Sequence, residues 1–153
     1  MLAGTGEMFA PAIAFIDVLF RASKIEPKAR EMIILRTAKI MNAAYEWQAN
    51  VILARNIGLT QTEIDAAATD GPVAGVHPDY VLLCKAADEL SLTSTLTDAT
   101  LSELVQRYDQ TLARTYILVI SWFNLLPRFV NGCRVPLETA DKIGTQTSPL
   151  GSA

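Results

Sequence analysis

The sequence contains few of the residue types on which enzymes most often rely. It has one histidine and two cysteines among 153 residues. That is too little histidine for a histidine-rich metal site and too little cysteine for a disulfide scaffold. Charged residues make up only 19% of the chain, and 13 basic against 16 acidic residues give a net charge of −3. Because this balance has no basic excess to hold a phosphate backbone, we expect no nucleic-acid partner.

Long hydrophobic runs are also missing. The longest largely apolar run, residues 116–126, is preceded by Arg114 and closed by Pro127, whereas a membrane-spanning helix needs about 20 apolar residues. Residues 1–14 have no basic segment ahead of an apolar stretch, as a signal peptide requires. We therefore expect a soluble, cytoplasmic protein that does not bind membranes.

Apolar residues are plentiful, although they are spread along the chain. Half of all residues are hydrophobic, which excludes a disordered protein. Such a surplus exceeds what the surface of a small soluble monomer usually carries, and a subunit interface is the simplest place for it. The composition therefore predicts a homo-oligomer.

Residues that are typical of helix starts and helix ends recur along the chain and favour a helical fold. Pro27 suits the first position of a helix, and Gly58 suits the position after a helix end. Thr60 and Glu63 form a capping box, and Thr97 suits an N-cap. The alternation typical of strands bounded by hairpin turns does not appear.

These signals predict an all-α fold, a single-domain helical bundle over residues 1–138 with a flexible C-terminal tail over residues 139–153. The predicted helices are residues 8–23, 27–41, 43–56, 60–68, 78–90, 97–110 and 111–126.

Two of the predicted helices carry carboxylates on faces that should be buried. On a helical projection Glu46 and Asn50 share a stripe with Leu53. Glu31 shares a stripe with Leu35 on the preceding helix. A carboxyl group buried in an apolar pocket has a raised pKa and can act as a general acid or base near neutral pH. The alternative is that Glu31 is a first-turn acid near a helix N-terminus and that Glu46 is an exposed edge residue.

The same stretch resembles the carboxymuconolactone decarboxylase family, which also includes the alkylhydroperoxidase D (AhpD) proteins. The resemblance covers most of the chain from Phe15 to Glu138. It is strongest where Tyr45, Glu46 and Trp47 follow Glu31. The segments that carry it are residues 30–36, 44–50, 54–59, 86–90, 122–124, 128–129 and 135–138.

The resemblance also indicates a branch of the family. In the peroxidase branch a Cys-x-x-Cys pair and a histidine follow an upstream glutamate, and those positions read Ala43, Glu46, Asn50 and Glu31 here. Both thiols are absent, so a peroxidase reaction is impossible at this site. The cysteine-free branch, nearer the decarboxylases, usually keeps the histidine, whereas this chain has Asn50.

We therefore expect the helical fold of this family in a homo-oligomer, a trimer or a hexamer, acting without a metal or other cofactor. The expected activity is acid/base catalysis on a small organic acid, lactone or polyketide-like carbonyl compound, by decarboxylation, dehydration, isomerisation or cyclisation. In this hypothesis Glu46 is the general acid/base, Glu31 is the supporting carboxylate and Asn50 is a polarising donor.

Other residues are candidates for binding the substrate, although each also has an ordinary structural interpretation. Loop histidines are usually solvated, aromatic residues usually pack, and an arginine at a helix end often forms a salt bridge. Arg36 lies off the Glu31 stripe and is interpreted as structural or interfacial. The candidates are Tyr45, Trp47, His77, Trp122, Asn124 and Arg128.

Two other functions stay open. The chain could be a non-catalytic oligomeric binding protein with a degenerate site, because a fold can persist after its chemistry is lost. A thiol peroxidase that uses Cys84 and Cys133 is the less favoured alternative, since each is expected to pack as a small apolar residue. A deep pocket that joins Glu31, Glu46 and Asn50 would favour the enzyme, and a filled or closed site would favour the binding protein.

Overall fold

The chain is all-helical. The computed structural model describes residues 2, 4–22 and 24–137, and the predicted tail lies outside these residues. No strand occurs in the described part, which confirms the predicted fold class. The helices are the 3-10 helix η1 (Gly6–Met8) and the α-helices α1 (Phe9–Arg21), α2 (Pro27–Ile40), α3 (Ala44–Asn56), α4 (Gln61–Ala68), α5 (Pro78–Thr93) and α6 (Asp98–Gly132).

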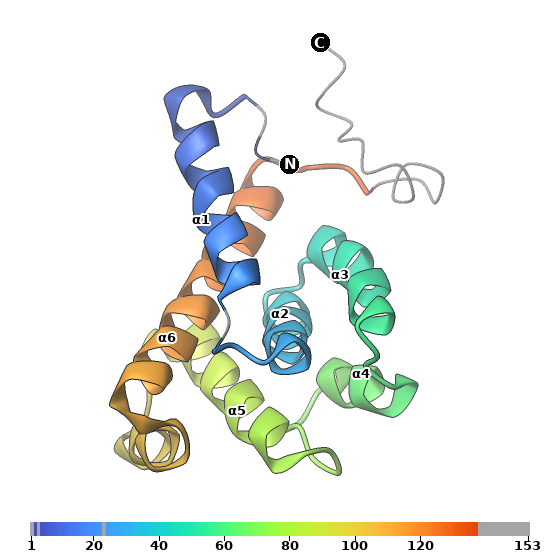
Figure 1. Ribbon diagram of the computed structural model, residues 1–153. Helices are drawn as coiled ribbons and strands as arrows, with labels where there is room; N and C mark the ends of the chain where they lie inside the picture. Colours follow the sequence, from blue (N-terminus) through green and yellow to red (C-terminus); the bar gives the residue numbers. More distant parts are fainter. Residues whose placement is uncertain (1, 3, 23, 138–153) are drawn as a thin grey trace.

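Helix α2 is the centre of the fold. It begins at Pro27, and the Glu26 carboxylate accepts hydrogen bonds from the backbone N–H groups of Lys28 and Ala29, which a helix start otherwise leaves unpaired. Ten consecutive residues, 29–38, are buried. Figure 1 shows α2 nearly end-on, with α3, α4, α5 and α6 around it.

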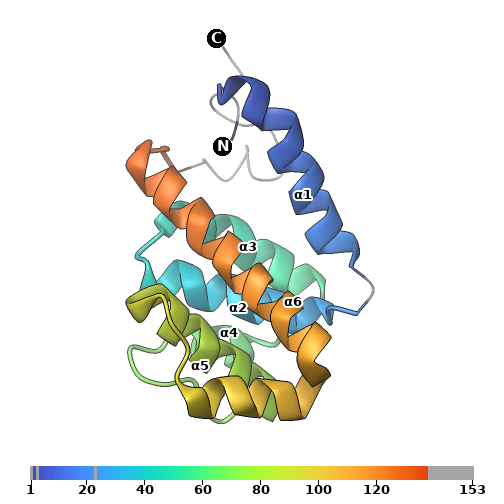
Figure 2. The ribbon, with the colours of Figure 1, turned by 90° about the vertical axis from the view of Figure 1, so that its left-hand side faces the viewer.

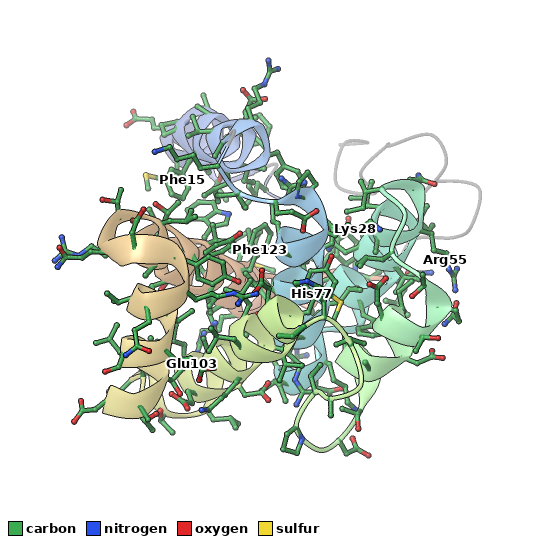
Figure 3. All side chains as sticks on the ribbon, turned by 60° about the horizontal axis from the view of Figure 1, so that its bottom comes forward. Phe15, Lys28, Arg55, His77, Glu103 and Phe123 are labelled. Carbon is green, nitrogen blue, oxygen red and sulfur yellow. The ribbon has the colours of Figure 1, made fainter. Side chains whose placement is uncertain are left out.

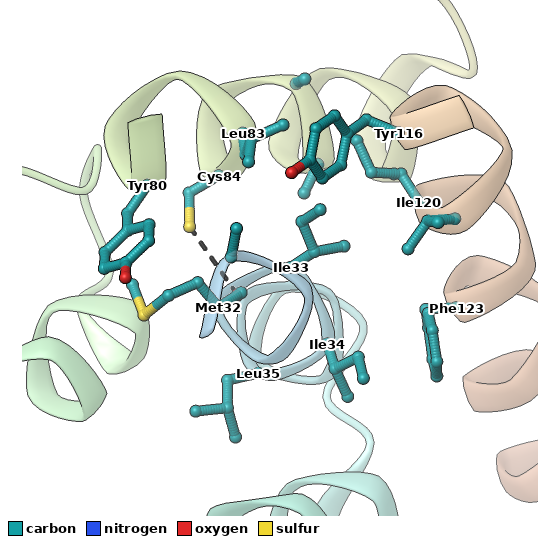
Figure 4. Close-up of a cluster of buried hydrophobic side chains, with 14 of the residues drawn as sticks. Met32, Ile33, Ile34, Leu35, Tyr80, Leu83, Cys84, Tyr116, Ile120 and Phe123 are labelled. Carbon is teal, nitrogen blue, oxygen red and sulfur yellow. Dashed lines mark hydrogen bonds between the residues drawn. The ribbon is translucent and has the colours of Figure 1, made fainter. Parts of the chain in front are cut away.

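The side chains of α2 connect these surrounding helices into one core. In Figure 4, Ile33 points toward Leu83 of α5 and Tyr116 of α6, whereas Ile34 and Leu35 point away from α5. Apolar side chains therefore surround the buried part of α2, so the polar groups of residues 29–38 are largely removed from water.

The predicted helix caps are present. Thr60 Oγ1 accepts a hydrogen bond from the backbone of Glu63, and the Glu63 carboxylate accepts one from the backbone of Thr60. Gly58 follows α3 with a φ of +90°, a conformation that glycine adopts without steric cost. Thr97 Oγ1 accepts a hydrogen bond from the backbone of Thr100 at the start of α6.

Helix α6 differs from the prediction in one respect. The expected break near residues 110 and 111 exists as a kink at Asp109, which has a φ of +64° and whose carboxylate caps the N–H groups of Thr111 and Leu112. Figure 2 shows the first part of α6, in yellow, turning sharply into the second, in orange. The predicted end before Pro127 is wrong, because α6 continues to Gly132. A proline removes one backbone hydrogen bond, and the burial of Pro127 and Val130 against the core keeps the helix intact.

Helix α5 is also longer than predicted. It runs to Thr93, three residues past the expected end, and stops where Ser94 adopts a left-handed φ of +62°. No glycine or proline marks this end, so the sequence signals for a helix end are missing here.

Helix α1 lies on the outside of the bundle, beside the second part of α6 (Figure 2). Aromatic side chains hold it there: Phe15 meets Trp122 edge-on with ring centres 4.5 Å apart, and Phe20 meets Phe123 at 6.3 Å. Figure 3 shows Phe15 and Phe123 between the helices, whereas Arg55 lies at the periphery. Several large apolar side chains of η1, α1 and α6 are nevertheless exposed: Met8, Phe9, Ile13, Val18, Leu118 and Leu125.

Among the described helices, none has the length and apolar character to cross a membrane.

Candidate active site

Glu31 is a buried carboxylate with an incomplete set of partners. It lies on α2, and only 1% of its surface is exposed. Arg30 Nε donates a long hydrogen bond to Glu31 Oε1 at 3.4 Å, and Oε2 has no hydrogen-bond partner in the described structure. Burial raises the pKa of Glu31 to about 7, although the adjacent Arg30 guanidinium opposes the rise. The interpretation of Glu31 as a first-turn acid near a helix N-terminus is wrong, because the first turn of α2 contains no acidic residue.

The Arg30 guanidinium contacts Phe20 as well as Glu31. Its Nη1 donates to the carbonyl oxygen of Phe20 at 3.2 Å, and its guanidinium lies over the Phe20 ring, 4.3 Å from the ring centre. These contacts fix the guanidinium against the end of α1. As a result, Arg30 reaches Glu31 with one long bond instead of a bidentate pair.

Glu46 is the second buried carboxylate. It lies in the first turn of α3 and is 5% exposed. Asn50 Nδ2 donates to Glu46 Oε2 at 3.2 Å, whereas Oε1 has no hydrogen-bond partner in the described structure. Burial raises the pKa of Glu46, and the hydrogen bond from Asn50 opposes the rise. The interpretation of Glu46 as an exposed edge residue is also wrong. Leu53, expected on the same buried stripe, is 42% exposed.

Asn50 uses its amide to hold Glu46. Nδ2 donates to the Glu46 carbonyl oxygen at 2.8 Å and to its carboxylate at 3.2 Å. A side-chain amide has two N–H donors, so both are directed at Glu46 in this arrangement. In this arrangement the Asn50 amide therefore orients Glu46, and its expected role as a polarising donor toward a substrate stays a prediction.

The two carboxylates lie at different depths of the same helix pair. A three-residue turn, residues 41–43, joins α2 to α3, and the two helices pack together. Glu31 lies nine residues before the end of α2, about 14 Å from this turn, whereas Glu46 lies about 3 Å and Asn50 about 9 Å beyond it. Asn50 therefore lies between the levels of the two carboxylates along the pair.

Such carboxyl groups are suited to proton transfer. Glu31, with a pKa of about 7, is partly protonated at neutral pH, so it can both donate and accept a proton, and burial shifts the pKa of Glu46 in the same direction. A partner-free oxygen on each group leaves an atom at which that transfer can occur. The geometry therefore supports acid/base chemistry by Glu31 and Glu46, with Asn50 fixing the orientation of Glu46.

The unpaired oxygens are closed to solvent in this arrangement. Glu31 Oε2 and Glu46 Oε1 are both buried. Four cavities lined by described residues lie elsewhere on the surface, and none of these four is lined by Glu31, Glu46 or Asn50.

Tyr45 and Trp47 lie beside different cavities at the start of α3. Tyr45 lines a cavity of about 400 Å³ between α3 and the end of α6. Trp47 lines another, of about 370 Å³, with Lys39 of α2 and Ala68 of α4. The two aromatic residues therefore line separate cavities among these four.

Asn124 and Arg128 lie together on α6. Arg128 Nη1 donates to the Asn124 carbonyl oxygen at 2.8 Å and to its side-chain oxygen at 3.2 Å. Both residues line a cavity of about 330 Å³ with Leu90, Ser94 and Ser121. Asn124 thus fixes Arg128 at the C-terminal end of α5.

Trp122 and His77 have structural roles. Trp122 packs on Phe15, lines an apolar cavity between α1 and α6, and buries an Nε1 that has no partner in the described structure. His77 is the N-cap of α5, where its Nδ1 accepts a hydrogen bond from the backbone N–H of Asp79 at 3.2 Å. The structure brings neither residue into contact with the two buried carboxylates.

The two cysteines differ in their surroundings. Cys84 is buried, its Sγ lies 3.7 Å from the Met32 carbonyl oxygen, and burial raises its pKa to about 12. A thiol with such a pKa forms almost no thiolate at neutral pH. Cys133 is exposed, so the expectation that it packs as an apolar residue is wrong. It directly follows the part of α6 beyond Pro127, where the predicted helix ended too early.

Two arginines were not selected from the sequence. Arg30 modulates Glu31, and its place directly before Glu31 was the available signal. Arg134 lines the cavity beside Tyr45, but it lies beyond the predicted last helix and no pattern marks it. Among the described residues, no cluster of three histidine, cysteine or acidic side chains is arranged to hold a metal ion.

Comparisons with known proteins bear on the family and the fold. A sequence model of the carboxymuconolactone decarboxylase family matches residues 7–88, more than half of the chain. No curated protein matches. Among solved structures, the chain is similar to ATU0492 from Agrobacterium tumefaciens, a protein of unknown function whose description names the antioxidant defence protein AhpD. The two share 19% identity over 87% of this chain and 92% of that one, with a TM-score of 0.75. At this identity the likeness shows the fold alone.

Proposed function

Since the chain belongs to the carboxymuconolactone decarboxylase family, we propose that it is an enzyme that performs acid/base chemistry on a small carbonyl acid, lactone or polyketide-like compound. One observation carries the proposal. Glu31 and Glu46 are both buried, and each has a carboxylate oxygen without a hydrogen-bond partner in the described structure. Burying an unpaired carboxyl group costs free energy, so such groups are concentrated where they have a chemical task.

Each residue has a defined role in this reaction. Glu46, whose pKa is raised by burial, donates a proton in its protonated form from the oxygen that Asn50 does not hold. In a decarboxylation, the bond to the carboxylate breaks, CO2 leaves, and the electron pair forms an enolate that takes up this proton. Glu31, with a pKa of about 7, is the second group able to accept or return a proton. The same two groups serve a dehydration, isomerisation or cyclisation.

The test compares isosteric variants of the acidic residues. A panel of β-keto acids and lactones is incubated with the protein, and product formation is followed by NMR. We expect Glu46→Gln to lower kcat by at least about 100-fold with an unchanged fold, because the amide cannot donate a proton. Glu103→Gln, an exposed acid on α6, is the matched control and should keep full activity.

Full activity of the Glu46→Gln variant on a substrate that the unaltered protein converts would contradict the assignment. Glu31→Gln should reduce turnover less if Glu31 only supports Glu46.

A second candidate function is a non-catalytic, oligomeric binding protein. The closure of both carboxylates to solvent favours it, and so do the exposed apolar residues Met8, Ile13 and Val18. The one basic residue of α1, Arg21, is paired with Asp17, so this face lacks the cations that a membrane-surface helix uses. A second copy of the chain is the better occupant.

Two measurements separate this candidate from the enzyme. Light scattering after size-exclusion chromatography should give a mass of several subunits, which Val18→Glu should lower. An oligomer without turnover on any substrate of the panel would favour the binding protein.

A thiol peroxidase is disfavoured by the burial of Cys84 and the rise in its pKa. A variant with both cysteines changed to alanine should behave as the unaltered protein does toward peroxide. Loss of a peroxidase activity in that variant would revive this candidate.

A further inference from the structure

The cavity beside Tyr45 is lined by residues that have no role in the proposed acid/base reaction. It lies between the start of α3 and the end of α6 and has a volume of about 400 Å³, within the range of small-molecule sites. Half of its lining is polar and half is apolar. The polar residues are Asn42, Tyr45, Asn131 and Arg134, and the apolar ones are Ala44, Val130, Val135 and Leu137.

Among the described lining residues, the polar half carries positive charge and no negative charge. Arg134 is the one charged residue among them, and none of them is a carboxylate. Among the described residues, Arg134 forms no side-chain hydrogen bond or ion pair. A guanidinium presents five donors in a planar fork that matches a carboxylate, so it is available for an anion that enters the cavity.

The structure holds this arginine in place through the backbone. The Arg134 N–H donates to the Asn131 carbonyl oxygen at 3.1 Å, and the Val135 N–H donates to Val130 at 3.0 Å. The Asn131 amide in turn donates to the Met41 carbonyl oxygen at 3.2 Å. The bond from Asn131 attaches the end of α6 to the turn between α2 and α3, so it connects the two walls of the cavity.

The start of α3 adds to the positive potential. Its N-cap residue is Ala43, which offers no side-chain cap to the first N–H groups of the helix. An anion in the cavity is therefore attracted by the Arg134 guanidinium and by a helix start.

We propose that this cavity binds the carboxylate of a small amphiphilic monocarboxylic acid, with Arg134 as the residue that recognises the acid group. The carboxylate lies against Arg134 and Asn131, and the apolar body of the acid lies against Val130, Val135 and Leu137. The apolar wall selects against inorganic phosphate, which has no apolar part to bury. Glu46 lies at the same end of α3 as this cavity. The inference that the bound acid is a substrate therefore rests on the proposed function.

The test uses benzoate, which has no keto group and is not converted, so that binding is measured apart from turnover. Benzoate is titrated into the full chain, and backbone amide shifts are followed by NMR. Saturable shifts are expected at residues 42–45 and 130–137. Benzamide, which has the same shape without the charge, should bind at least about tenfold more weakly, and inorganic phosphate should not saturate the site.

Variants assign the recognition to one residue. Arg134 is exposed after the last helix, so Arg134→Gln should fold normally and should bind benzoate at least about tenfold more weakly. Arg134→Lys should bind benzoate with an intermediate affinity, because lysine keeps the positive charge but lacks the planar guanidinium. Arg55→Gln, an exposed arginine at the other end of α3, should bind as the unaltered protein does.

The possible outcomes separate this inference from the proposed function. Equal binding of benzoate and benzamide, or undiminished binding by Arg134→Gln, would overturn the carboxylate site. Glu46→Gln should bind benzoate normally even though it should lose turnover. An inactive protein that still binds benzoate through Arg134 would therefore refute the enzyme and leave the site standing.

Discussion

Two buried residues of α2, Arg36 and Glu31, lie only five positions apart but differ in how many of their hydrogen-bonding atoms have partners. Arg36 uses all five of its N–H donors: two bonds to the Asp88 carboxylate and three to the carbonyl oxygens of Ala67, Thr69 and Gly71. Glu31 has one long bond from Arg30 and an oxygen without a partner in the described structure. Both are 1% exposed, so burial alone does not distinguish them.

This difference indicates which of the two residues, Arg36 or Glu31, stabilises the fold. A buried charge with every partner present holds elements together, and Arg36 joins α2 to α5 and to the loop after α4. A buried charge with a missing partner costs stability, and proteins retain such costs mainly at functional sites. The prediction that Arg36 is structural is confirmed, and the incomplete group is the one assigned to chemistry.

The largest expected effect comes from breaking the complete group. Arg36→Met leaves the Asp88 carboxylate and three carbonyl oxygens without their donor, which should lower the free energy of unfolding by about 3–5 kcal/mol. Arg30→Met should cost less, because Glu31 can take up a proton when its neighbour is removed. Urea unfolding of both variants at pH 7 measures the difference. Equal losses would show that the two groups do not differ.

A smaller effect should appear in the pH dependence of stability. Because the pKa of Glu31 is raised from 4.5 to about 7, the folded protein keeps a proton between these values that the unfolded chain releases. The free energy of unfolding should therefore be highest below pH 4.5 for this group and should fall by up to about 3 kcal/mol as the pH rises through 7.

Glu31→Gln removes this titration. Its stability should decline less between pH 5 and 8 than that of the unaltered protein, with a remainder that comes from Glu46. Urea unfolding at half-unit pH intervals is the measurement. A decline as steep as before would mean that Glu31 is not protonated in the folded state.

The smallest effect concerns the residue that holds Glu46. Asn50→Ala removes one hydrogen bond to the buried carboxylate, which should cost about 1 kcal/mol at pH 7 and raise the pKa of Glu46 further. Side-chain carboxyl NMR of the variant detects the change in pKa. Asn56→Ala, which truncates an exposed amide at the end of the same helix, is the control and should leave that pKa unchanged.

Much of the fold could be predicted from local signals. The capping box at Thr60, the glycine after α3 and the N-cap at Thr97 each act over three or four residues, so the sequence contains all their partners. The prediction that the last helix ends before Pro127 is wrong, because the backbone hydrogen bond that a proline removes is a local effect. The burial that outweighs this loss comes from packing against residues distant in the sequence. The end of α5 at Ser94 carries no local signal at all.

The candidate site could be predicted in part. Helical periodicity and the family resemblance both selected Glu31, Glu46 and Asn50, and all three are buried. Their partners could not be predicted. The orientation of the Asn50 amide, the contact of Arg30 with Phe20 and the distribution of Tyr45, Trp47 and Arg128 over separate cavities all depend on how the helices pack.

The amino-acid order was enough to establish an all-α chain, its family and two carboxylates on buried faces, since periodicity and short motifs are properties of neighbouring residues. Packing between helices established which carboxylate oxygens lack partners among the described residues, that burial raises both pKa values, and that these oxygens are buried. The physical reason is that desolvation depends on every atom around a charge, and the helices that pack against α2 include α5 and α6, which lie far from it in the sequence.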